Sequence, residues 1–132
     1  MSDASNRIPT YVNGLDQQMQ GGIPQGHIVL LAGVSGSMKS SLGFSLLYNA
    51  VREGRASGIY VTLEQGKKSL GGHMANMGMD VEDANVRSSI AIIDLADLRV
   101  QLDARGIDKE VDWMGQLIKQ LTNYRESIGF DI

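Results

Sequence analysis

The chain has 132 residues, of which 42% are hydrophobic and 20% are charged, as is ordinary for a soluble globular protein. It contains no cysteine, and this excludes disulfides, thiolate zinc sites and thiol nucleophiles. The net charge of −3 gives no overall basic surface for nucleic acid, and the longest apolar run is too short to cross a membrane. Because the polar N-terminus is not a secretory signal, we expect a cytoplasmic protein of about one domain.

Apolar residues divide the chain into alternating strands and helices. Unbroken apolar or β-branched runs predict strands, and the run at 27–32 is typical of a strand buried on both faces. Apolar residues at three- and four-residue spacing predict helices. The predicted strands cover 27–32, 59–63 and 89–95, and the predicted helices cover 42–51, 67–77 and 111–128.

This order predicts an α/β fold. Parallel strands need crossover connections, which are most often helices, so we expect a mostly parallel sheet with helices on both faces. Residues 130–132 resemble the beginning of another strand, and the chain stops there. We therefore expect residues 1–132 to form a single, partial domain.

The stretch GVSGSMKSS at 33–41 resembles a phosphate-binding loop. Gly33, Lys39 and Ser40 meet the pattern G-x-x-x-x-G-K-[ST], while Met38 stands where the second glycine belongs. A buried strand, a glycine-rich turn and a helix start in that order bring backbone N–H groups to phosphates. We expect Lys39 to reach the outer phosphates of a nucleotide and the Ser40 hydroxyl to ligate Mg²⁺. The alternative is a glycine turn that binds nothing.

Met38 leaves two alternatives open. If the backbone of residue 38 needs a positive φ, a residue other than glycine costs about 1–2 kcal/mol there. If the backbone has an ordinary φ, an outward-pointing methionine is harmless. Gly33 and Gly36 provide the tight turn and the close approach in either case, so we expect a competent loop.

Glu64 ends the second predicted strand, in YVTLEQG at 60–66. Ligands of open parallel sheets gather outside the carboxyl ends of the strands, so this carboxylate could orient and deprotonate a water that attacks a terminal phosphate. The alternative is a solvated glutamate. Asp94 and Asp97 are expected to be solvated loop carboxylates. His27 and His73 are expected to be structural, since neither has a partner at metal-ligand spacing.

The segments GLDQQMQGGIPQGHIVLLAGVSGSMKSSL at 14–42 and GIYVTLEQ at 58–65 together resemble the KaiC-like branch of the RecA-type P-loop ATPases. The resemblance extends from residue 8 over essentially the whole chain and includes MGMDVED at 77–83. It implies ATP as the nucleotide with Mg²⁺, and a RecA-like fold. It also implies a homo-oligomeric ring or filament with the nucleotide site at a subunit interface.

The resemblance carries site residues over by position. Glu64 matches the glutamate that polarises the attacking water, and Lys39 is expected to be the second catalytic residue, in contact with the phosphates. Gln65 stands where the family has a second glutamate, and the Walker B strand is expected at about the point where the chain stops. The phosphate-loop residues are Gly33, Ser35, Gly36, Ser37, Lys39, Ser40 and Ser41, with Met38 in the place of the loop glycine.

Two functions from different classes follow. The first is an ATPase that hydrolyses ATP with Mg²⁺ in an intact parent protein, the 132-residue chain itself being inactive. The second is a non-hydrolytic ATP-binding switch or accessory subunit that regulates assembly or signalling through a protein partner. The pattern from Gly14 to Glu64 favours the first, and Met38, Gln65 and the absent Walker B strand favour the second. We expect no membrane contact, and nucleic-acid contact only through segments that this chain lacks.

Overall fold

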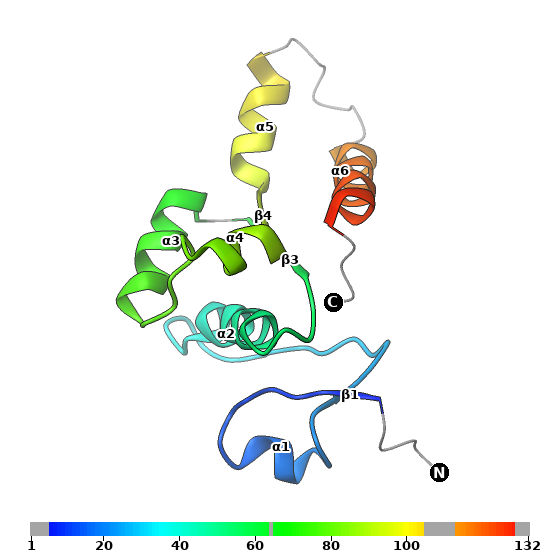
Figure 1. Cartoon of the computed structure of the whole chain (residues 1–132). Helices are drawn as coiled ribbons and strands as arrows, with labels where there is room; N and C mark the ends of the chain where they lie inside the picture. Colours follow the sequence, from blue (N-terminus) through cyan, green and yellow to red (C-terminus); the bar gives the residue numbers. More distant parts are fainter. Residues whose placement is uncertain (1–5, 64, 105–112, 129–132) are drawn as a thin grey trace.

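The computed structural model describes residues 6–63, 65–104 and 113–128. Figure 1 places β1 and α1 below α2, and α3 and α4 above it. The elements in chain order are β1 (Arg7–Ile8), α1 (Leu15–Gln18), β2 (Ile23–Pro24), α2 (Lys39–Arg52), β3 (Gly58–Thr62), α3 (Lys67–Asn76), α4 (Ala84–Ser89), β4 (Ile90–Asp94), α5 (Leu95–Ala104) and α6 (Trp113–Ile128).

The parallel pair β3–β4 confirms the α/β prediction for the second and third predicted strands. The two strands pair over their full length, from Gly58 with Ile90 to Thr62 with Asp94. Helices α3 and α4 form the crossover between them, because the ends of two parallel strands lie too far apart for a tight turn. The register brings the carboxyl ends of both strands to one edge.

Helix α2 supplies the centre of the core. The Phe44 side chain is fully buried, and its ring meets the ring of Tyr60 on β3 edge-on, with 5.3 Å between centroids. The Tyr48 ring lies 6.4 Å from the Phe44 ring, one turn further along α2. The buried core residues are Phe44, Tyr48, Val51, Leu70, Met74, Met79, Val86 and Ile90.

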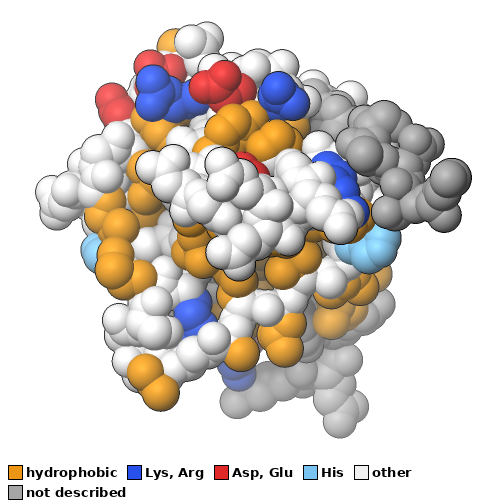
Figure 2. Space-filling model, turned by 90° about the horizontal axis from the view of Figure 1, so that it is seen from below, with side chains coloured by type: hydrophobic (Ala, Val, Ile, Leu, Met, Phe, Trp, Pro, Cys, Tyr) orange, Lys and Arg blue, Asp and Glu red, His pale blue; other side chains and the backbone are white. Residues whose placement is uncertain are grey.

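The prediction of a buried strand at 27–32 is wrong for the part of the chain that the structure describes. No strand forms there, and the side chains of Ile28 and Leu30 are 101% and 87% exposed. A strand needs a pairing partner, and the described strands pair only as β1 with β2 and β3 with β4. An apolar run indicates a tendency to be buried and does not supply the partner. Hydrophobic side chains also lie exposed in several groups on the lower face (Figure 2).

The predicted helices are confirmed at α2 and α3, and at α6 from Trp113 onward. The predicted helix start at 111–112 and the predicted strand at 130–132 lie outside the described residues. Helices α4 and α5 and the short elements near the N-terminus were not predicted. Among the helices described, none is long and apolar enough to cross a membrane.

The β1–β2 pair explains a glycine in the GGIP motif. Ile8 pairs with Ile23, and Gly22, just before β2, has φ +127°. A Cβ on Gly22 would lie 2.7 Å from the carbonyl carbon of Ile8 and 2.8 Å from the Cα of Pro9. The two backbones therefore approach closely only because residue 22 has no side chain.

Asp16, in the first turn of α1, accepts hydrogen bonds from the segment that follows β1. Its Oδ1 accepts hydrogen bonds from the Thr10 N–H at 2.8 Å and the Thr10 hydroxyl at 2.6 Å, and its Oδ2 accepts one from the Tyr11 N–H at 3.0 Å. Burial acts to raise the pKa of the Asp16 carboxyl, but these hydrogen bonds outweigh burial and hold the pKa below its ordinary value. The aspartate of the GLD motif thus has a structural role here.

Gly22→Ala is expected to destabilise the β1–β2 pair by more than Gly26→Ala does. Both glycines have positive φ, but a Cβ on Gly26 meets nothing within 4 Å. The Gly26 variant should therefore cost only the conformational strain of about 1–2 kcal/mol, while the Gly22 variant adds a backbone clash. Hydrogen exchange of the Ile8 and Ile23 amides measures the difference. Equal loss of protection in both variants would contradict the clash.

Acid is expected to loosen the Asp16 network. Because the folded-state pKa of Asp16 is lowered, its stabilising contribution is complete above the unfolded value of about 3.9 and is lost as pH falls through the folded pKa. The exchange protection factors of the Thr10 and Tyr11 amides should therefore decrease as the pH is lowered below about 3.9. Asp16→Asn should be less protected at pH 7 and insensitive to acid, whereas Asp103→Asn, which removes an exposed carboxylate on α5, should behave like the wild type.

Candidate phosphate-binding site

The glycine-rich segment 33–38 forms a tight turn directly before α2. The Ser37 N–H donates to the carbonyl oxygen of Val34 at 3.2 Å. Gly36 has φ +79°, which glycine adopts without strain. A Cβ on Gly33 would lie 2.5 Å from the Oγ of Ser37, so a larger residue at position 33 would require the Ser37 hydroxyl to turn away.

The Lys39 side chain folds back over this turn. Its Nζ donates to the carbonyl oxygens of Gly33 at 2.9 Å and Val34 at 2.8 Å, and to the Oγ of Ser37 at 3.4 Å. An ammonium group has three donors, and all three are engaged. The positive charge of Lys39 is thereby held over the glycine turn.

Helix α2 begins without a capping side chain. Met38 is the N-cap residue, and no side-chain hydrogen bond caps this end of the helix. The N–H groups of a first helical turn have no acceptor within the helix, and they carry the positive end of the helix dipole. Ser40 lies exposed in this turn. An anion at this end of α2 would meet backbone N–H groups and the Ser40 hydroxyl together.

The structure decides between the two alternatives for Met38. Its backbone has φ +61° and ψ +25°, in the left-handed region, so a residue other than glycine is strained there. The side chain is 58% exposed, and packing returns little of that cost. Met38 in place of glycine therefore lowers the stability of the protein through its backbone conformation.

Ser41 lies apart from the exposed serines of the loop. Its side chain is buried, and its Oγ lies 3.4 Å from the Nε2 of His73 on α3. The contact joins the first turn of α2 to α3. Sequence reasoning placed Ser41 with the phosphate loop and gave no signal for this contact, because the spacing between residues 41 and 73 carries no pattern.

Glu64 lies outside the described residues, and Thr62 and Gln65 on either side of it are joined by hydrogen bonds. The Thr62 hydroxyl donates to the carbonyl oxygen of Gln65 at 2.9 Å and accepts from the Gln65 N–H at 3.3 Å. The Gln65 Nε2 donates to the Oγ of Ser69 in α3 at 3.1 Å. The Gln65 side chain is thus bound to α3.

Asp94 and Asp97 do not lie in a loop as predicted, whereas Asp97 is exposed to solvent as expected. Asp94 ends β4, and its Oδ2 accepts from the Lys67 N–H at 3.1 Å while its Oδ1 accepts from the Asp97 N–H at 3.1 Å. Asp97 lies in the first turn of α5, and its Oδ2 accepts from Gln101 at 2.7 Å. The carboxyl ends of two parallel strands lie at the same edge of a sheet, and this could have indicated the hydrogen bond between Asp94 and the start of α3. Within the described residues, no group of three or more His, Asp or Glu could hold a metal ion.

Comparison with known proteins decides the family. The protein-family model described as "ATPase: KaiC" matches residues 8–131. The chain belongs to the KaiC family of ATPases. This membership confirms the resemblance drawn from the GLD, GGIP and phosphate-loop motifs.

KaiC-family relatives agree in sequence and in structure. A UPF0273 protein of Saccharolobus solfataricus is 39% identical over 67% of the chain and 31% of the relative. A UPF0273 protein of Pyrococcus horikoshii is 31% identical over 94% of the chain and 47% of the relative. The crystal structure of a KaiC-like protein of Pyrococcus horikoshii matches with a TM-score of 0.63 and 30% identity, over 75% of the chain and 49% of that protein. The chain thus spans less than half the length of these relatives, and the RecA-type α/β fold is confirmed for this part.

Met38→Gly is expected to raise the free energy of unfolding by about 1 kcal/mol, because glycine adopts the left-handed conformation without strain. The gain is smaller than the full strain, since glycine also adds entropy to the unfolded chain. Urea denaturation measures the change. Met38→Ala keeps the strained φ, so it should bring no comparable gain. If alanine stabilised the chain as much as glycine, side-chain exposure and not backbone strain would be the cause.

Proposed function

We propose that the chain binds ATP with its phosphates against the turn 33–38 and the first turn of α2. The observation that carries this proposal is the uncapped start of α2, preceded by a glycine turn and covered by a lysine ammonium. Backbone N–H groups, a helix dipole and a lysine are the donors that nucleotide phosphates require. Membership of the KaiC ATPase family supports ATP as the nucleotide.

Lys39 would exchange partners when phosphates bind. Its bonds to the carbonyl oxygens of Gly33 and Val34 would be replaced by bonds to phosphate oxygens, which carry full negative charge and accept more strongly. The exposed Ser40 hydroxyl fits a Mg²⁺ ion that takes its other ligands from water and phosphate, since this ion does not need a cage of protein carboxylates. When bound, the ion would neutralise charge on the phosphates.

For the whole protein we propose ATP hydrolysis in the cytoplasm by a homo-oligomer. Glu64 would orient and deprotonate the attacking water, and Lys39 would stabilise charge on the transferred phosphate. The match of GLD, GGIP and YVTLE to the family pattern supports this assignment.

The second candidate function is an ATP-binding switch without turnover. Two observations favour it for this chain. Met38 is strained at the N-cap, and Gln65, which stands in the place of a second carboxylate, is bound to Ser69. A protein partner would then respond to the nucleotide-bound state of the loop.

A thermal melt with Mg²⁺–ATP tests binding. At about 100 times its dissociation constant, ATP should stabilise the fold by about 2.7 kcal/mol, or several degrees in a domain of this size. Lys39→Ala should abolish the shift. Lys119→Ala, which removes an exposed lysine on α6, should keep it. A shift that survives in Lys39→Ala would place the nucleotide elsewhere.

Phosphate release from the full-length parent protein separates the two functions. Hydrolysis that Glu64→Gln reduces by 100-fold or more, with ATP binding unchanged, would support the enzyme. ATP binding without release in the wild type would support the switch.

A further inference from the structure

Ser41 belongs both to the first turn of α2 and to a contact with α3. At this end of α2 the first hydrogen bond within the helix runs from the Leu42 N–H to the Met38 carbonyl oxygen, at 2.9 Å. The N–H groups of residues 39–41 precede this bond, so they are the donors that an anion would meet. The Oγ of Ser41 contacts the Nε2 of His73 at 3.4 Å. One residue thus offers a backbone donor to the nucleotide and a hydroxyl to a second helix.

The contact joins a buried hydroxyl to an exposed imidazole. Ser41 is 6% exposed, whereas His73 is exposed on α3. Among the described residues, the Ser41 Oγ has no hydrogen-bond partner other than His73. A buried hydroxyl without a partner is costly, so this contact fixes the Ser41 side chain. Because His73 is exposed, its replacement removes little packing and should keep the fold.

Helix α3 holds His73 in place because the helix is itself bound on two sides. Leu70 and Met74, which are 1% and 0% exposed, anchor it in the core. Ser69 accepts a hydrogen bond from the Nε2 of Gln65, which follows β3, at 3.1 Å. Residues four positions apart lie on the same face of a helix. This face of α3 therefore binds the end of β3 with Ser69 and the start of α2 with His73.

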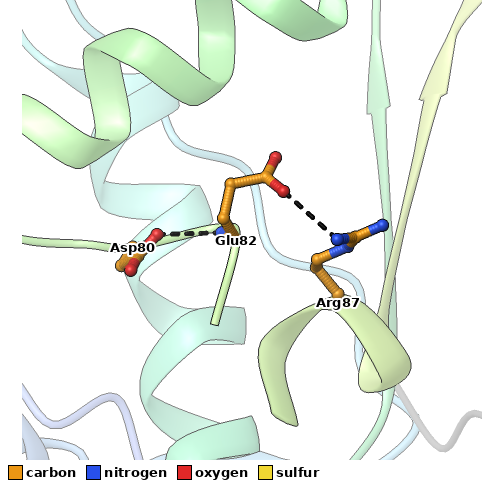
Figure 3. A network of polar contacts seen from close by, with 3 residues as sticks. All are labelled: Asp80, Glu82 and Arg87. Atoms are coloured by element: carbon orange, nitrogen blue, oxygen red, sulfur yellow. Dashed lines mark hydrogen bonds and ion pairs between the residues drawn. The ribbon is translucent and has the colours of Figure 1, made fainter. Parts of the chain in front are cut away.

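The connection that follows α3 is bound as well. The Asp80 N–H donates to the Tyr48 hydroxyl of α2 at 3.3 Å. The Asp80 Oδ1 accepts from the Glu82 N–H at 2.9 Å, and the Glu82 Oε2 lies 3.4 Å from the Nη1 of Arg87 on α4 (Figure 3). The position of α3 relative to α2 is thus set from both ends of α3.

We propose that His73 is a positioning residue of the nucleotide site, an inference that rests on the ATP binding proposed above. By holding the Ser41 hydroxyl, His73 fixes the first turn of α2 and its free N–H groups before the phosphates arrive. Donors that are already in place lose less conformational entropy when a ligand binds, so the ligand binds more tightly. His73 acts through Ser41 and is not itself a ligand of the nucleotide.

Affinities for Mg²⁺–ATP, measured by isothermal titration calorimetry on the full 132-residue chain, test the proposal. His73→Leu removes the hydrogen-bonding group and should weaken ATP roughly five-fold, the effect of one hydrogen bond. His73→Gln has an amide that can donate or accept, so it should restore most of the affinity. The control is His27→Leu, at an exposed histidine whose Nδ1 lies 3.3 Å from the Gln25 carbonyl oxygen, and it should have no effect.

A double-mutant cycle tests whether His73 acts through Ser41. Ser41→Ala should weaken ATP about as much as His73→Leu does, and the two changes together should weaken it no further. Additive losses would overturn the inference, because His73 would then act independently of Ser41. A purely structural His73 would change the free energy of unfolding in urea and leave the affinity for ATP unchanged, which would also overturn it.

The wild type separates this inference from the proposed function. If the wild type binds ATP and the His73 variants bind it equally well, the positioning role fails and the proposed function stands. If the wild type binds no ATP, both fail.

Discussion

The parallel pairing of β3 with β4 is the constraint on which the rest of this structure depends. It sets Thr62 beside Asp94 and so brings two strand ends, and the helices that leave them, to one edge. Asp94 then accepts from the first N–H of α3 and from the first turn of α5. The same pairing presents the ring of Tyr60 to Phe44, which anchors α2 on the sheet.

The start of α2 combines three features that are unfavourable or unused in the protein alone. The helix has no side-chain cap, Met38 is strained, and the Lys39 ammonium binds the carbonyl oxygens of its own turn. An anion would satisfy the uncapped N–H groups, and phosphate oxygens are stronger acceptors than carbonyls. The strain of about 1–2 kcal/mol at residue 38 is smaller than the sum of several charge-assisted hydrogen bonds. The left-handed backbone of Met38 is already present without a ligand, so its strain lowers the stability of the turn.

Much of the fold was predictable from the sequence, and the misses have separate causes. The helices α2 and α3 and the strands β3 and β4 were predicted, the helices from the spacing of apolar residues and the strands from apolar or β-branched runs. The strands β1 and β2 have two residues each, too few for any period. The run 27–32 has the composition of a strand but has no partner among the described strands. The bond of Asp94 to the Lys67 N–H was missed because α3 begins 27 residues earlier in the chain.

The sequence by itself determined the family, the loop and the chemistry of its donors, because motifs such as GLD, GGIP and GxxxxxKS are local and need no partner. Only the tertiary structure decided the left-handed backbone of Met38 and the contact of Ser41 with His73. Each of these depends on how distant segments pack or on which φ a turn adopts. Composition and spacing carry no record of such contacts, since they form between elements whose separation along the chain is set by loops.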